Sequence, residues 1–342
     1  MRAQFEVIHR WSAEQGHQLQ AIAGIPWFYR QFGYELALPR GGGPFVHTSS
    51  LMPPPRQDPP AYRLRAMGEE DLGFAVELDG HAAARSLVTV PRDARLWRYE
   101  LAGRSPGSAL RQEMRIIESA EGDPVGFLTH APRLNGARLD VTGWELKPGI
   151  SWRAVWFPLL AYALATGETY ASADGQARFS IISFWWTGLG HPVGRLIPPQ
   201  GPSRPQAWYV RVPDVPAFLR AVAPVLERRL GESLLAGHTG ELSLSFYRDG
   251  IRLVFERGRV VAGEVWQPSI QIPSQEWGMP STDPRRAMAM FPGLSFLQLL
   301  FGFRSLEELE AAFPDCLVRT HEVRALLTAL FPKQASDVWA LA

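Results

Sequence analysis

The sequence predicts a protein of mixed α/β and α+β fold class that is divided into several domains. Its 342 residues leave room for two or three domains, at about 100–200 residues each. Between residues 61 and 207, stretches typical of strands and of helices alternate along the chain, as they do in mixed α/β domains. From residue 208 to residue 342, a run of strands lies between stretches typical of helices, and this segregation of strands from helices is typical of an α+β domain.

The composition excludes several classes of partner. Hydrophobic residues make up 46% of the chain and charged residues 20%, as in ordinary globular proteins. The formal net charge of +1 gives no electrostatic reason to expect nucleic acid or an anionic membrane surface as a partner. No segment reaches the roughly 18 uninterrupted apolar residues of a membrane span, and charges at Arg2, Glu6 and Arg10 argue against a signal peptide. We therefore expect a cytoplasmic protein.

The cysteine and histidine residues predict neither a disulfide nor a metal site. Cys316 is the single cysteine, which suits a reducing compartment, and we expect it to be a buried structural thiol. The eight histidines show no metal-ligand spacing such as H-x-x-x-H. His191 and His238 follow glycines in stretches typical of loops, where a structural role is expected.

The first 38 residues carry the densest local signals. We expect a helix over 2–15, a buried strand over 17–25, a short helix or turn over 26–31 and a strand that ends at Leu38. Pro26 suits a first helical turn, where its missing N–H would be unpaired, and Gly33 suits the left-handed position that ends a helix. Judged by burial preferences alone, this stretch could also be simply an aromatic segment of the core.

Prolines mark the boundary that follows. The stretch Pro53-Pro-Pro-Arg-Gln-Asp-Pro-Pro60 favours an extended, semi-rigid backbone, and we expect an interdomain linker over residues 47–60. The glycines at positions 41–43 precede neither a Lys-Ser/Thr pair nor a helix, so they do not indicate a phosphate loop.

Residues 61–207 are expected to form the mixed α/β domain. The turn residues Glu121-Gly-Asp-Pro124 indicate a hairpin between two apolar stretches. In chain order we expect a strand over 62–65, a helix over 69–78, hairpin strands over 113–118 and 125–129, a strand over 139–146, a helix over 153–165, a strand over 180–186 and another over 208–212.

Residues 208–342 are expected to form the α+β domain. Asp214 can cap a helix of period 3.6, which Pro224 should kink or divide. The turns at Asp249-Gly250 and Arg257-Gly258 predict a three-stranded meander over residues 241–266. Later helix signals are a cap at Asp283-Pro284, an apolar run over 294–303 and a capping box from Ser305 to Glu308.

One short motif resembles a known family. Tyr29-Arg-Gln-Phe-Gly-Tyr34 resembles the Y-x-x-F-G-Y box that closes the catalytic domain of the GCN5-related N-acetyltransferases (GNAT), and it is especially similar to that of the bacterial enhanced-intracellular-survival (Eis) type. The order helix, strand, short helix, strand over residues 2–38 is also that of the last part of this fold. The resemblance implies tandem GNAT-like units followed by a sterol-carrier-protein-like α+β domain.

The resemblance assigns an expected identity to each segment. Residues 1–46 would be the C-terminal part of a first GNAT domain, residues 47–60 a proline-rich linker, residues 61–207 a second, degenerate GNAT-like domain and residues 208–342 the sterol-carrier-protein-like domain.

The resemblance also implies that the first GNAT-like unit is incomplete. In the family, the loop R/Q-x-x-G-x-G/A that binds the pyrophosphate of acetyl-CoA precedes the first of these helices, where this sequence has Met1. We therefore expect a fragment, a start assigned too late, or a second polypeptide that supplies the rest. Such an incomplete unit should expose the apolar side chains of Phe5, Trp11 and Trp27.

The second unit offers no substitute for this loop. Between the strand over 139–146 and the helix over 153–165, the chain reads Lys147-Pro-Gly-Ile-Ser-Trp152. The proline interrupts the run of backbone N–H groups that would hold a phosphate, so we expect a structural copy that does not bind acetyl-CoA.

The activity implied by the resemblance is acetyl transfer from acetyl-CoA, as cosubstrate, to a small-molecule or peptide amine, without a metal. Tyr29 would be the general acid, since a phenol of pKa about 10 can protonate a thiolate of pKa about 8.5. The base would be the terminal carboxylate of Ala342, whose ordinary pKa is about 3.3–3.7. The alternatives are a phenol that is hydrogen-bonded to the backbone and a frayed, solvated tail. Tyr34 is expected to be structural, and Glu35 to face solvent.

Other interpretations stay open. As it stands, this polypeptide is expected to be inactive, because it lacks the acetyl-CoA loop. A non-catalytic binding or assembly module, whose sterol-carrier-like domain holds an apolar ligand, is the alternative, and the apolar run over 294–303 is the feature that supports it. The resemblance also allows a homo-oligomer.

Overall fold

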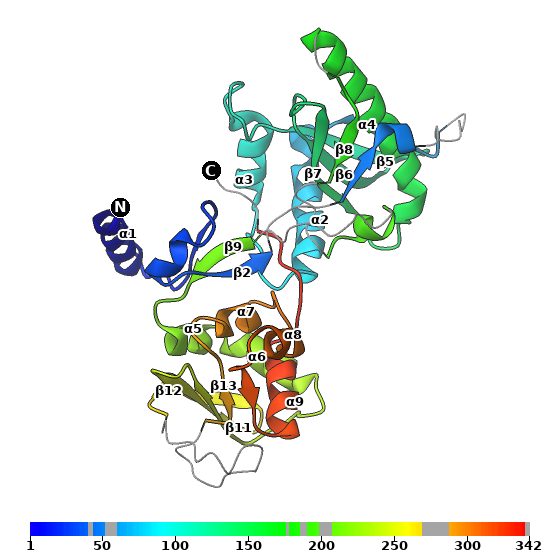
Figure 1. Ribbon diagram of the computed structural model, residues 1–342. Coiled ribbons are helices and arrows are strands. Elements are labelled where there is room, and N and C mark those ends of the chain that lie inside the picture. Colours follow the sequence, from blue (N-terminus) through cyan, green and yellow to red (C-terminus); the bar gives the residue numbers. More distant parts are fainter. Residues whose placement is uncertain are drawn as a thin grey trace. The chain divides into compact units, whose positions relative to one another are not determined.

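The computed structural model describes residues 1–39, 44–51, 60–175, 178–184, 190–197, 207–268 and 287–338. The chain divides into two compact units (Figure 1). The first unit combines Met1–Leu38 with Ala207–Gln334, and the second combines Pro39–Gln206 with the residues from Ala335 onward. Among the described residues, no helix has the length and hydropathy needed to cross a bilayer.

The N-terminal part of the first unit has the predicted order of elements. It consists of α1 (Arg2–Glu14), β1 (Gln20–Ile22), a 3₁₀ turn (Phe28–Phe32) and β2 (Glu35–Pro39). Gly33 caps the 3₁₀ turn in the left-handed conformation, with φ of 82°, as expected for a residue without a Cβ.

A distant strand completes the first sheet. β9 (Ala207–Arg211) lies between β1 and β2, and its antiparallel register with β1 pairs Gln20 with Arg211. The prediction of a buried strand over 17–25 was wrong in its length and its burial. β1 spans only Gln20–Ile22, none of its three residues is buried, and it lies at the edge of the sheet, with a neighbouring strand on one side only. The expected domain boundary at residue 207 therefore coincides with the start of a strand that returns to the first sheet.

The remainder of the first unit is an α+β arrangement. Its helices are α5 (Val215–Ala221), α6 (Ala223–Gly231), α7 (Phe296–Leu300), α8 (Leu306–Ala312) and α9 (His321–Leu330). Its strands are β10 (Gly240–Ser245), β11 (Gly250–Glu256), β12 (Arg259–Trp266), β13 (Ala289–Met290) and β14 (Leu317–Val318), in the sheet order β12-β11-β10-β13-β14.

Several local predictions in this region are confirmed. Pro224 lies in the first turn of α6 and separates it from α5. The meander forms with antiparallel pairing, and the Ser305–Glu308 capping box closes at the start of α8. The side chains of α7 are all buried, as the apolar run predicted. The predicted cap at Asp283-Pro284 lies outside the described residues.

The second unit is built on a six-stranded sheet. Its strands are β3 (Phe45–His47), β4 (Tyr62–Ala66), β5 (Glu113–Ser119), β6 (Pro124–His130), β7 (Arg138–Leu146) and β8 (Ile181–Ser183), and its helices are α2 (Leu72–Ala84), α3 (Ala94–Arg98) and α4 (Trp152–Asp174). The sheet order is β3-β8-β7-β6-β5-β4, with β7 and β8 parallel.

The two faces of this sheet are covered by different helices (Figure 1). Alternate residues of one strand face opposite sides, so Leu128 packs with Leu159 of α4 whereas its neighbour Phe127 packs with Trp97 of α3. β3 pairs with β8, which places Phe45–His47 in this sheet rather than in the first domain, where a boundary at residue 46 was expected.

Candidate functional site

Tyr29 lies in a cluster of aromatic rings within the first unit. Its ring centroid is 5.3 Å from that of Tyr209 on β9, 6.1 Å from that of Phe5 on α1 and 6.4 Å from that of Tyr34. We call Tyr29, Tyr34 and Tyr209 the phenol cluster. Three segments that are far apart in sequence therefore converge on the motif that sequence analysis selected.

Two of the three phenols have hydrogen-bonded hydroxyls. The Tyr34 hydroxyl donates to Gln20 Oε1 at 3.2 Å and lies 3.1 Å from His9 Nε2. The Tyr209 hydroxyl accepts the Trp27 N–H at 2.6 Å. In the described part of the chain, the Tyr29 hydroxyl makes no hydrogen bond, and its side chain is partly exposed. The bond to Tyr209 leaves the Tyr209 proton unused, but Tyr209 is buried, as is Tyr34. Tyr29 is thus the partly exposed phenol of the cluster that can offer its proton to a ligand, and Tyr34 has the contacts of a structural residue.

Burial also shifts the pKa values of Tyr34 and His9. Burial raises the pKa of Tyr34, against an opposing effect of the Arg211 charge. Burial and the same arginine lower the pKa of His9. Both shifts favour the neutral forms of these two side chains near pH 7.

The turn before Tyr29 sets the position of its hydroxyl. A Cβ added at Gly24 would lie 2.7 Å from the Tyr29 hydroxyl oxygen, and Gly24 has a φ of +151°. Trp27 adopts a φ of 69°, which is costly for a bulky residue. The hydrogen bond from the Trp27 N–H to Tyr209 stabilises this conformation, and glycine at position 24 leaves room for the phenol.

The surroundings of Glu35 differ from the expectation. Glu35 is buried, and its Oε1 accepts hydrogen bonds from Arg30 Nη2 at 2.5 Å and from Gln298 Nε2 at 3.2 Å. The predicted solvent-facing position was wrong, because α7 covers this side of β2 and carries Gln298. Sequence periodicity cannot show such a contact, since it involves residues 263 positions apart.

The apolar side chains expected to be exposed behave differently from one another. Trp11 and Trp27 are 58% and 72% exposed, which confirms the expectation for these two residues. Phe5 is buried instead, because its ring stacks on that of Phe32 at a centroid distance of 4.2 Å.

The second predicted catalytic group, the carboxylate of Ala342, lies outside the described residues, as do Trp339 and Leu341. The description of the chain ends at Val338. Its role as a base stays a prediction.

The turn before α4 uses its backbone amides internally. Lys147 N–H donates to the carbonyl of Val125 at 2.8 Å, and Ile150 N–H donates to the carbonyl of Lys147 at 3.2 Å. The Ser151 side chain caps α4 by accepting the N–H of Ala154. These two amides of the turn are therefore not available to a phosphate, and the expectation that this unit does not bind acetyl-CoA stays a prediction.

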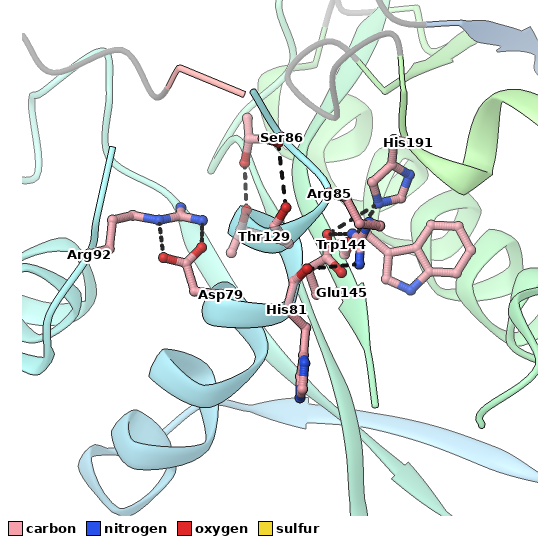
Figure 2. A network of polar contacts seen from close by, with 11 residues as sticks. Asp79, His81, Arg85, Ser86, Arg92, Thr129, Trp144, Glu145 and His191 are labelled. Atoms are coloured by element: carbon pink, nitrogen blue, oxygen red, sulfur yellow. Dashed lines mark hydrogen bonds and ion pairs between the residues drawn. The ribbon is translucent and has the colours of Figure 1, made fainter. Parts of the chain in front are cut away.

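A network of charged side chains, in which Asp79 and Glu145 are buried, lies on the other side of the same sheet (Figure 2). Arg85, directly after α2, donates to Glu145 Oε1 on β7 at 2.5 Å. Arg92 forms a two-point ion pair with Asp79 of α2. Burial raises the pKa of Glu145 to about 7, although Arg85 opposes this shift. We call Asp79, Arg85, Arg92, Glu145 and the nearby Asp337 the charged cluster.

His191 borders the charged cluster as a neutral residue. Its Nε2–H donates to the carbonyl of Trp144 at 2.7 Å, and its Nδ1 accepts the N–H of Val193 at 3.1 Å. Burial lowers the pKa of His191 to about 4. Both ring nitrogens are occupied, so His191 has the structural role that was expected.

A small cavity of about 30 Å³ opens beside the cluster, and Arg85, Glu145, His191, Ser336 and Asp337 are among its lining residues. Sequence analysis missed this site, because its members come from four separated segments. Two weak signals existed: Asp79 interrupts the apolar face of α2, and Glu145 stands between Trp144 and Leu146 in a buried strand.

Within the described residues, no group of three or more His, Cys, Asp or Glu side chains is arranged to hold a metal ion. Cys316 is buried, and burial raises its thiol pKa to about 12. The prediction that this thiol is buried is confirmed.

No protein-family model matches the sequence, and no curated protein matches it. Solved structures with similar folds exist. A GCN5-related N-acetyltransferase from Anabaena variabilis ATCC 29413 has a TM-score of 0.60 and 15% identity over 98% of this chain and 76% of its own. A probable N-acyltransferase of unknown function from Enterococcus faecalis V583 has a TM-score of 0.60 and 16% identity over 100% of this chain and 76% of its own.

Eis1 from Mycobacterium abscessus is also similar, with a TM-score of 0.52 and 14% identity over 99% of this chain and 76% of its own. At such identities the likeness concerns the fold. The chain therefore has the fold of the GCN5-related N-acetyltransferases, including the Eis type, and the predicted fold class is confirmed. The sterol-carrier-like character of residues 208–342 stays a prediction.

Proposed function

We propose that this polypeptide is part of an N-acetyltransferase that transfers acetyl from acetyl-CoA to an amine, with Tyr29 as the general acid. The observation that carries the proposal is the Tyr29 hydroxyl, which makes no hydrogen bond among the described residues and belongs to a partly exposed side chain, whereas Tyr34 and Tyr209 are buried and hydrogen-bonded. The acetyltransferase fold of the chain supports this choice of reaction.

In the proposed reaction, the amine nitrogen forms a bond to the thioester carbon and the carbon–sulfur bond breaks. The departing thiolate takes the proton of the Tyr29 hydroxyl. The amine loses a proton, through water, to a carboxylate, for which we propose the terminal carboxylate of Ala342. A second proton transfer through solvent then restores the phenol and the carboxylate.

We further propose that the 342-residue polypeptide does not bind acetyl-CoA by itself. In the turn before α4, the amides of Lys147 and Ile150 are paired within the protein, and Pro148 has no N–H to offer a phosphate. Both observations support this part of the proposal.

The test has two parts. Calorimetric titration of the 342-residue polypeptide with acetyl-CoA should give no saturable heat, whereas micromolar affinity would disprove the placement of the loop. Thiol release from acetyl-CoA should then be measured with a panel of primary amines, on this polypeptide and on a version extended upstream in its reading frame. Amine-dependent thiol release by the extended version is expected, and its absence with every amine would overturn the proposed reaction.

A further inference from the structure

The turn that carries Tyr29 is bounded by two residues with a positive φ. Trp27, directly before the 3₁₀ turn, has a φ of 69°, and Gly33, directly after it, has a φ of 82°. Two backbone hydrogen bonds close the turn: Arg30 N–H donates to the carbonyl of Trp27 at 3.2 Å, and Gly33 N–H donates to the carbonyl of Arg30 at 3.1 Å. Because 3₁₀ turns have poorer hydrogen-bond geometry than α-helices, contacts from outside the turn are needed to fix the position of the phenol.

Glu35 on β2 supplies such a contact. Its Oε1 accepts hydrogen bonds from Arg30 Nε at 3.2 Å and from Arg30 Nη2 at 2.5 Å, and the Leu36 N–H donates to the same oxygen at 3.0 Å. Glu35 is 7% exposed, and hydrogen bonds between ionised groups are stronger than those between neutral groups. Arg30 follows Tyr29 directly, so this pair ties the middle of the turn to β2.

The Arg30 guanidinium also contacts the residue before the turn. Its Cζ lies 5.0 Å from the centroid of the Trp27 ring, which is within the range of a cation–π interaction. The Trp27 N–H in turn donates to the Tyr209 hydroxyl at 2.6 Å. Arg30 therefore links Trp27 to Glu35, and Tyr29 lies in the segment that these contacts hold.

Gln298 of α7 extends these contacts into the α+β part of the same unit. Its Nε2 donates to Glu35 Oε1 at 3.2 Å, and the residue is 4% exposed. Its Oε1 is buried and has no hydrogen-bond partner in the described part of the chain. A buried amide oxygen without a partner is costly, and an apolar side chain of the same size would avoid this cost. The packing of α7 alone therefore does not explain a glutamine at this position, whereas the bond to Glu35 does.

We propose that Gln298 and Glu35 are positioning residues for Tyr29. Gln298 orients the Glu35 carboxylate, and Glu35 holds Arg30 and with it the turn. This inference rests on the proposed function, in which the Tyr29 hydroxyl must lie close to the leaving sulfur. Neither Gln298 nor Glu35 contacts the reacting atoms. Helix α7 thus acts on proton transfer at Tyr29 through a short series of side-chain contacts.

Fluorine NMR of the 342-residue chain tests the position of the phenol independently of catalysis. The eight tyrosines are replaced by 3-fluorotyrosine, and the Tyr29→Phe variant identifies the Tyr29 resonance. Gln298→Met keeps the size of the side chain but removes its N–H donors. We expect this variant to shift or broaden the Tyr29 resonance and to leave that of Tyr170, in the second unit, unchanged.

Thermal unfolding separates positioning from a purely structural role. In Gln298→Met the midpoint should stay the same or rise, because the unpaired Oε1 is removed together with the donor. A lower midpoint without any change of the Tyr29 resonance would overturn the proposal. Leu326→Met, at a buried position of α9, is the matched control and should leave the Tyr29 resonance unchanged.

Two variants of Arg30 test the same contacts from the side of the turn. Arg30→Met removes both hydrogen bonds to Glu35 and should change the Tyr29 resonance at least as much as Gln298→Met does. Arg30→Lys keeps a charged donor and should restore the resonance in part. A Tyr29 resonance that is unchanged in Arg30→Met would overturn the proposal.

The effect on the reaction is measured on the upstream-extended protein with the thiol-release assay. Gln298→Met should lower kcat by about 10- to 100-fold, because a displacement of about 1 Å at a catalytic group can cost about 10²-fold. The KM for the amine should not change, since Gln298 does not contact the amine. An altered Tyr29 resonance with an unchanged kcat would support the positioning and overturn the role of Tyr29 as the acid. An unaltered resonance would overturn the positioning, whatever the rate.

Discussion

The phenol cluster of the first unit and the charged cluster of the second unit differ in how their polar groups are paired. In the phenol cluster, neutral groups satisfy one another, and the Tyr29 hydroxyl remains available. In the charged cluster, the carboxylates of Asp79 and Glu145 are buried, and each is paired with an arginine. The first arrangement leaves a proton donor for a reaction, whereas in the second the ion pairs compensate for the loss of hydration of the carboxylates.

The largest expected effect concerns the phenols. Tyr29→Phe should lower kcat of the catalytically competent, upstream-extended protein by about 10²- to 10⁴-fold, because the leaving thiolate loses its acid. The thiol-release assay measures this change. Tyr34→Phe is the matched control, since it removes a phenol of the same cluster, and it should act on stability more than on kcat. Equal losses of kcat in the two variants would mean that Tyr29 has no catalytic role that Tyr34 lacks.

The next effect concerns the buried ion pair. Asp79→Ala should reduce the free energy of unfolding by about 3–5 kcal/mol, because it leaves the Arg92 charge buried without this partner. Denaturant unfolding, followed for the second unit, measures the change. Arg98→Ala disrupts the exposed pair between Arg98 and Glu69 and should cost about 0–1 kcal/mol. A cost below 1 kcal/mol for Asp79→Ala would show that the charged cluster is not a buried network in solution.

The pH dependence of the free energy of unfolding should also distinguish the charged cluster from the phenol cluster. The folded-state pKa of Glu145, about 7, is raised above its ordinary value of 4.5. The folded state therefore retains this proton up to a higher pH than the unfolded state does. Stability is therefore fully present below pH 4.5 and falls as the pH rises towards 7, by about 3 kcal/mol at 1.36 kcal/mol per unit.

Unfolding between pH 4.5 and 8 should show this loss, and Glu145→Gln should lack it. A pH profile unchanged by Glu145→Gln would show that another group titrates.

The smallest predicted effect concerns the turn before Tyr29. Gly24→Ala should cost about 1–3 kcal/mol of stability, because a Cβ there adopts a strained φ and meets the Tyr29 hydroxyl. Gly16→Ala also has a positive φ, of +73°, but meets no atom within 4 Å, and it serves as the control for backbone strain alone. Thermal unfolding compares the two variants. The same cost for both would mean that the phenol does not constrain position 24.

The parts of the fold that depend on neighbouring residues could be predicted from the sequence. The cap at Gly33, the division of a helix at Pro224 and the capping box at Ser305 each involve a few adjacent residues and formed as expected. The candidate acid Tyr29 could be proposed for the same reason, since its motif is contiguous.

Features that depend on tertiary contacts could not be predicted in this way. The burial of Glu35 requires Gln298 from α7, and the charged cluster joins Asp79 to Asp337 across most of the chain. In each case a polar residue in a strand or helix has the same local pattern whether it faces solvent or a distant partner. The distant partner determines whether the residue is buried, and the sequence around the residue does not reveal that partner.

The position of β9 has a consequence for synthesis. Gln20 pairs with Arg211, so the ribosome must add about 190 further residues before the first sheet can close, which takes about 10–40 s at usual elongation rates. During that time the strands of the second unit that carry its hairpins can already pair as they emerge. β1 and β2, which both pair with β9, therefore stay without this neighbour while the second unit is synthesised.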